Sequence, residues 1–326
     1  MLRLAHFLVE RAPLPNKALA GSLSDILGKI HEHLVGRELN GGKFMSPDSE
    51  REHNELKKSL SAHGPTRYQE EVDKAKTTAA AIKQHHPDIR AVHHVSKAGD
   101  IERVTGKKTS QTEDPSDLML EKKDGSFHGI SLKSGAKASS SPGLHNEGRS
   151  KIDKRLGVNT DKHVKSIHGK LITKHPELGN KSVSEVKAAI KTNPKIKQSF
   201  DTIRKPALEK IRNEYHSAYS AMNTREVSQH LIHITHSIPT SIPHTRVTTV
   251  GVGSSASTVL ANPAEKNKEF YTDHKNIVVS KSGSNSIMFH HVHPKTGKKT
   301  LLARERLKFA SGSDSAATVK SSVSEK

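Results

Sequence analysis

The sequence predicts an α/β (α+β) fold, because helical and strand patterns follow one another along the chain in an order typical of layered structures. Apolar residues recur at helical spacing through residues 22–40, and three strand-like runs follow between residues 89 and 135. Further helical segments occupy residues 151–236, and strand patterns return after Pro243. We therefore expect a sheet flanked by helices, followed by a strand-rich C-terminal part.

The first helix has recognisable signals at both ends. Ser22, with Asp25 three residues later, resembles a helix N-cap, and Asn40 with Gly41 is a strong C-terminal signal. Residues 48–86 then form a polar segment that we also expect to be helical. Its mixed charges are typical of a solvated helix face.

Residues 115–135 predict a β-hairpin, because two short apolar runs flank a Lys-Asp-Gly-Ser turn. Asp124 followed by Gly125 between such runs is a strong local hairpin signal. Side chains alternate between the two faces of a strand, so Ser131 and Lys133 share one face. The hairpin therefore has an acid, Asp117, before its first strand and a Ser-x-Lys pair at the end of its second strand.

The length of the turn decides which of these side chains meet. A two-residue loop pairs Asp117 with Leu132 and turns the acid away from the lysine. A three-residue loop places Asp117 opposite Ser131 or Lys133, and Gly125 can take the left-handed conformation that this loop needs. With the longer loop, the two charged groups converge across neighbouring strands.

Composition indicates a basic protein with a thin core. The 326 residues include no Trp and only 3% aromatic residues, and the hydrophobic fraction is 32%. The formal charge of +19 and the pI near 9.9 favour a polyanionic partner, and DNA suits this charge. No apolar run approaches the length that spans a bilayer, so we expect no membrane partner. The absence of cysteine fits a reducing compartment.

The hairpin resembles the PD-(D/E)xK nuclease superfamily. In that pattern a Pro-x-Asp is followed, after about ten to twenty residues, by an (Asp/Glu)-x-Lys that closes the next strand. The matching residues are Pro115-Ser116-Asp117 and Ser131-Leu132-Lys133. The run Gly129-Ile130-Ser131-Leu132-Lys133 also resembles predicted nucleases of tailed phages, in which serine replaces the second acid.

The resemblance implies a fold and a reaction. The fold is an αβββαβ core with a mixed sheet, to which this chain adds helical insertions and a β-rich C-terminal extension. The reaction is hydrolysis of DNA phosphodiesters that requires Mg²⁺ or Mn²⁺. Asp117 binds the metal, Ser131 assists through its hydroxyl or a water, and Lys133 activates or orients the nucleophile. A serine hydroxyl is a much weaker ligand than the acid it replaces.

The third carboxylate is expected from a helix. Residues 28–34 resemble the first helix of many of these nucleases, which implies that Glu32 completes the metal site. Glu70 and Glu71 are rivals, because they lie nearer to the hairpin in sequence. An ordinary polar helix face is the alternative interpretation of Glu32.

Two groups of basic residues suit contact with DNA phosphates. Lys97, Lys107 and Lys108 precede the hairpin, beside the expected site. Lys298 and Lys299 lie at the tip of a second expected hairpin, near the C-terminus. The alternative for both groups is a role in solubility.

The domain organisation follows from these patterns. We expect an N-terminal segment with the core helix over residues 1–46 and a helical insertion over 47–88. A nuclease-like core with a helical region covers 89–255, and a β-rich extension covers 256–310. Residues 311–326, rich in Ser, Ala, Thr and Lys, are expected to be disordered.

Two functional hypotheses remain open. The first is a phage-encoded nuclease; the second is a nucleic-acid-binding virion or DNA-packaging protein that keeps the nuclease fold without turnover. The Ser at position 131 and the sparse core favour the second, and the intact Asp and Lys favour the first. Either protein is expected in the cytoplasm of a host cell or within a phage particle, with virion components as further partners.

Overall fold

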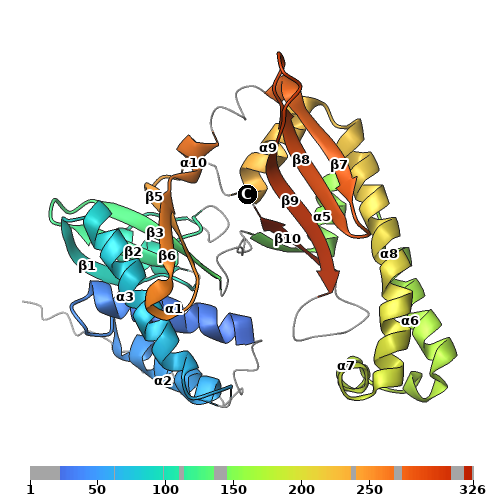
Figure 1. Ribbon diagram of the computed structural model, residues 1–326, viewed down its shortest axis with the longest axis horizontal. Coiled ribbons are helices and arrows are strands. Elements are labelled where there is room, and N and C mark those ends of the chain that lie inside the picture. The colour runs from blue at the N-terminus through green and yellow to red at the C-terminus, as the bar shows by residue number, and fades with distance from the viewer. Residues whose placement is uncertain are drawn as a thin grey trace, which may run out of the picture.

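The protein contains two units, each with a sheet and a core of its own. A computed structural model describes residues 23–61, 63–97, 99–109, 114–135, 145–235, 240–267, 274–309 and 319–324. Figure 1 shows the two sheets side by side, the first in green and orange and the second mainly in orange and red. The α/β class is confirmed.

The first unit is a mixed sheet covered by helices. Its helices are α1 (Leu23–Leu39), α2 (Pro47–Ser61), α3 (Arg67–His85) and α4 (Asp100–Thr105). Its strands are β1 (Ile89–His94), β2 (Leu118–Lys122), β3 (Phe127–Gly135), β5 (His244–Val250) and β6 (Ser257–Ala261). They lie in the order β1-β2-β3-β5-β6, with β3 and β5 parallel and the other neighbours antiparallel.

The expected N-terminal helix is α1, although Ser22, its predicted cap, lies outside the described residues. Ile26, Ile30 and Leu34 recur at helical spacing, and their burial fixes which face of α1 packs on the sheet. With α3 they form an apolar core against Leu118 and other residues of β2 and β3. A smaller cluster, which includes Ile101 of α4, forms beside Met119.

The β2–β3 turn has three residues. Leu118 pairs with Ile130, and Gly125 has a φ of 81°, in the left-handed region that glycine tolerates. Continuing the register by one residue places Asp117 beside Ser131. The alternative that turns the acid away from the lysine is therefore wrong.

The second unit joins helices to an antiparallel sheet. Its helices are α5 (Arg149–Leu156), α6 (Asp161–Lys174), α7 (Val183–Thr192), α8 (Pro194–Ala221) and α9 (Thr224–Ile234). Its strands are β4 (His145–Gly148), β7 (Ile277–Ser282), β8 (Ser286–Val292), β9 (Lys299–Phe309) and β10 (Val319–Ser324), in the order β4-β10-β9-β8-β7. The short helix α10 (Pro263–Lys266) follows β6.

Three features differ from the expected grouping. The helices between residues 149 and 234 share their core with β7, β8 and β9. They are expected, however, to belong with the first strands. Strand β6 completes the first sheet, although residues 256–310 are expected as a separate extension. Residues 319–324, expected to be disordered, form β10 between β4 and β9. In each case the chain reaches an apolar surface or a strand edge that is distant in sequence.

Candidate active site

Asp117 lies where β2 begins, between β1 and β3. Its backbone N–H donates to the Ile130 carbonyl at 2.8 Å, and its own carbonyl accepts from the Val95 N–H at 3.1 Å. Its carboxylate Oδ2 accepts a 2.7 Å hydrogen bond from the Leu132 N–H. The backbone and the side chain of Asp117 are thus held by both neighbouring strands.

The surroundings of Asp117 alter its acidity. Burial raises the pKa of this carboxyl group from 3.8 to about 7. Lys133 lowers the pKa, Glu32 raises it, and the Leu132 N–H and His94 lower it further. Side chains from α1, β1 and β3 therefore act on one carboxyl group.

Glu32 projects from α1 towards β1. Its Oε2 lies 3.7 Å from Nε2 of His94, at the end of β1. The His94 ring contacts the His33 ring, with 4.7 Å between their centroids. Burial and the neighbouring His94 lower the pKa of His33 to about 4, and Ser49 forms a 2.9 Å hydrogen bond with its Nδ1.

A further acid stands behind this pair. Glu52 of α2 lies 3.9 Å from Nε2 of His33, and Lys29 and Lys97 each approach it to 3.6 Å. Although burial raises the pKa of Glu52, His33 and the two lysines outweigh this and lower it. A chain of titratable side chains thus leads from Glu52 through His33 and His94 to Glu32.

Ser131 and Lys133 belong to the middle and end of β3, which pairs with β2 on one side and β5 on the other. Ser131 is buried, with 2% of its surface exposed, whereas Lys133 is half-buried. The parallel partner of Ser131 in β5 is Arg246, which is also buried. Lys133 is therefore the more accessible of the two beside Asp117.

The rival acids lie elsewhere. Glu71 of α3 faces His31, at 3.4 Å from its Nδ1, and neither Glu70 nor Glu71 is among the groups that shift the pKa of Asp117. One turn further along α3, buried Lys74 donates hydrogen bonds to the Ser134 hydroxyl at 2.7 Å and to the Gly135 carbonyl at 3.0 Å. These groups support the end of β3 from the helical side of the sheet.

The lysines expected to contact DNA are divided between the units. Lys97 approaches Glu52, and the Lys107 ammonium donates to the Ser241 carbonyl at 3.1 Å. Lys108 is exposed nearby. Lys298 and Lys299 are exposed on the β8–β9 hairpin, in the sheet that does not carry Asp117.

Sequence reasoning missed His33, His94 and Glu52. All three were visible only as polar residues in a helix or at a strand end, and no spacing links them to the motif. Their pairing depends on the packing of α1 and α2 beside β1. The only indication of these residues in the sequence was His94, a histidine at the end of the strand that precedes the hairpin.

The residues present fit a hydrated divalent cation. Among the described residues, no group of three His, Asp or Glu side chains could hold a metal ion. Mg²⁺ needs fewer protein ligands, because it keeps several waters and binds through one or two carboxylates. Asp117 and Glu32 supply two carboxylates, and Glu32 raises the pKa of Asp117 as a like charge does. A divalent cation held by these two carboxylates would relieve that repulsion.

The fold and this cluster define an α/β protein with a carboxylate–lysine site where strands β1, β2 and β3 diverge. The chain matches no protein-family model and no curated protein. Among solved structures it matches the restriction endonuclease MspI in complex with its cognate DNA, with 15% identity and a TM-score of 0.32 over 95% of this chain and 93% of that chain. That score is too low to establish a shared fold. None of the described helices is long and apolar enough to cross a membrane.

Proposed function

We propose that the chain is a metal-dependent nuclease that hydrolyses DNA phosphodiesters. One observation carries this proposal: Glu32 of α1 and Lys133 of β3 come from separate elements, and both act on the charge of Asp117. A buried acid with a raised pKa beside a second acid and a lysine is typical of catalytic sites. The run from Gly129 to Lys133, which resembles phage nucleases, supports a phage origin.

In this proposal Asp117 and Glu32 hold Mg²⁺ or Mn²⁺. When bound, the ion supplies a water of lowered pKa beside the phosphate. Lys133, beside Asp117, would orient the attacking water and offset negative charge that develops on the phosphate. Ser131 contributes its hydroxyl beside Asp117, and His94 holds Glu32 in place from β1.

Cleavage of supercoiled plasmid tests the proposal directly. The full chain is incubated with plasmid in Mg²⁺, Mn²⁺ or EDTA, alongside the Asp117→Asn and Lys133→Ala variants. We expect metal-dependent nicking that falls by at least about 100-fold in both variants, as is usual when a transition-state contact is removed. Lys123→Ala is the matched control, because Lys123 is an exposed lysine in the turn of the same hairpin.

A second candidate function is a nucleic-acid-binding virion or packaging protein without turnover. The observation that favours it is Ser131, which stands where the resembled nucleases carry a metal-binding acid. This function predicts that plasmid is retarded on a gel but never cut in any metal. It also predicts that Asp117→Asn and Lys133→Ala bind DNA as tightly as the parent.

A further inference from the structure

The positive charge of the chain is unevenly distributed. Residues 23–135, which carry the whole candidate site, contain 18 Lys and Arg and 18 Asp and Glu, so their formal net charge is zero. Residues 145–235, which form α5 to α9, contain 18 Lys and Arg but only 9 Asp and Glu. The excess charge that suits a polyanion therefore lies on the second unit, away from Asp117.

The acids of this helical region are already engaged locally. Each of the eight acidic side chains between residues 149 and 234 caps a helix or pairs with a basic neighbour. Asp201 of α8, for example, lies 2.7 Å from Arg204, and Glu214 lies 3.0 Å from Lys162. Asp201 lines the same pocket as Lys197 and Lys205 but is paired with Arg204, so each of these acids already has a local partner.

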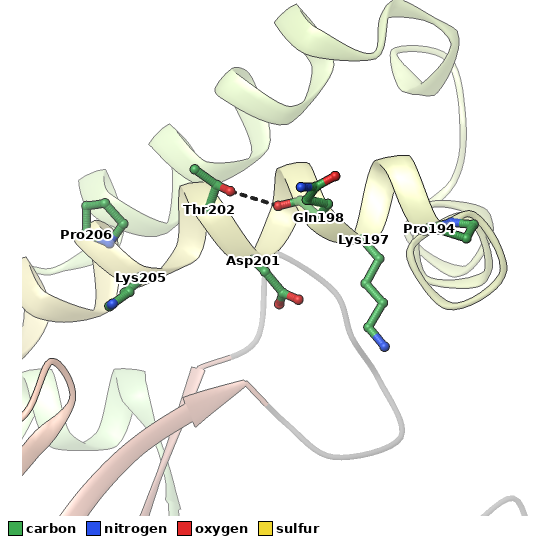
Figure 2. Close-up of a pocket in the computed structure, with 7 residues that line it drawn as sticks. All are labelled: Pro194, Lys197, Gln198, Asp201, Thr202, Lys205 and Pro206. Carbon is green, nitrogen blue, oxygen red and sulfur yellow. Dashed lines mark hydrogen bonds between the residues drawn. The ribbon is translucent and has the colours of Figure 1, made fainter.

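Four exposed lysines gather on α6 and α8. Lys197 and Lys205 line a pocket on α8, and Figure 2 shows them on the same side of the helix as Asp201. Lys170 of α6 and Lys210 of α8 line a second pocket between these helices. The two pockets share Pro206, so they adjoin. None of the four lysines has an acidic partner in the part of the chain that the structure describes.

These lysines extend along α8 over a length that spans several phosphates of a nucleic-acid strand. Lys197 and Lys210 are 13 residues apart in α8, which corresponds to about 20 Å at 1.5 Å per residue. Along one DNA strand the phosphates rise about 3.4 Å each, so 20 Å covers about six of them. Lysine side chains are long and flexible, so lysines spread over that length of α8 can reach several phosphates.

We propose that the surface formed by Lys170, Lys197, Lys205 and Lys210 binds the phosphate backbone of double-stranded nucleic acid. We name it the α6–α8 basic surface. Its lysines contact the phosphates through their charge and do not read the bases, since lysines neutralise phosphates whatever the nucleic-acid sequence. The proposal does not require that the Asp117 site cleaves DNA.

Salt dependence of binding tests this surface. The full chain and a Lys170→Gln, Lys197→Gln, Lys205→Gln, Lys210→Gln variant are titrated with a fluorescent 20-base-pair duplex in EDTA, from 50 to 200 mM salt. The slope of log K against log salt changes by about 0.9 for each phosphate contact. We expect the slope of the variant to be smaller by about 2 to 4, and its affinity at 50 mM salt to be at least about tenfold lower.

A matched variant separates a specific surface from net charge. Lys43, Lys58, Lys76 and Lys123 are exposed lysines of the first unit, and their change to Gln removes the same four charges. We expect this control to keep the parent slope to within about one unit. The proposal is overturned if the two quadruple variants have equal slopes of log K against log salt, or if both keep the slope of the parent. Because EDTA is present throughout, the result does not depend on cleavage.

Discussion

The Asp117 carboxylate accepts a 2.7 Å hydrogen bond from the backbone N–H of Leu132. This hydrogen bond lies just beyond Leu118 and Ile130, the last pair between β2 and β3 at this end. The Asp117 side chain therefore satisfies the Leu132 N–H at the point where the two strands diverge. The same bond holds Asp117 next to Ser131 and Lys133. Four predictions follow from the arrangement around this carboxylate.

The pH dependence of stability should change when Asp117 is replaced by Asn. The folded pKa of about 7 exceeds the ordinary 3.8, so between these values the folded state binds more protons than the unfolded state. Metal-free protein should therefore lose stability as the pH rises from about 4 to 7. The loss is at most about 4 kcal/mol, at about 1.4 kcal/mol per pKa unit.

Urea unfolding of both proteins in EDTA at pH 4.5 and pH 8 measures this effect. The unfolding free energy of Asp117→Asn, measured relative to that of the parent, should therefore be larger at pH 8 than at pH 4.5. Histidines distant from Asp117 contribute equally in both proteins, so their contribution cancels in the comparison. Parallel pH profiles for the two proteins contradict the raised pKa of Asp117.

Replacement of Glu32 by Gln should affect cleavage much more than the same change at Glu71. Glu32 raises the pKa of Asp117 and lies 3.7 Å from His94, whereas Glu71 faces His31 on the helical side of the sheet. We expect Glu32→Gln to lower Mg²⁺-dependent nicking by at least about tenfold, typical of the loss of a ligand. Glu71→Gln should remain within about threefold of the parent. The reverse order would make Glu71 the third carboxylate of the site.

Introduction of an acid at position 131 should strengthen metal binding at a cost in stability. Ser131 is 2% exposed and lies beside Asp117, so a second carboxylate there is buried next to a like charge. Ser131→Asp should lower the unfolding free energy in EDTA by about 2 to 4 kcal/mol. Calorimetric titration with Mn²⁺ should show tighter binding than in the parent, and weaker binding would count against a metal at Asp117.

The three-residue turn depends on the left-handed conformation of Gly125. Its φ of 81° is unfavourable for a residue with a Cβ, so Gly125→Ala should lower the unfolding free energy by about 1 to 2 kcal/mol. Gly28→Ala in α1 is the control, because a Cβ there meets nothing within 4 Å. That change should stabilise the helix by about 0.5 to 1 kcal/mol. Urea unfolding of the two variants should therefore give shifts of opposite sign.

Much of the local structure could be predicted from the sequence. Helix α1 followed from apolar spacing and the hairpin from its turn residues, and the structure contains both. The capping box of Ser182 with Glu185, which begins α7, is likewise a pattern of four residues. Leu208, Ile211 and Tyr215 of α8 recur at helical spacing and are buried in the core. These features depend on interactions between residues that are close in the chain.

The sequence by itself determined the helices, the hairpin and the residues Asp117, Ser131 and Lys133 that flank its strands. Only the tertiary structure decided that Glu32 and His94 approach Asp117, and that the helices after residue 149 join the C-terminal strands. The physical reason is that an apolar pattern shows which face of an element is buried, but not which distant surface buries it. Local hydrogen bonds and backbone preferences are encoded over a few residues, whereas the meeting of α1, β1 and β3 depends on how the whole core packs.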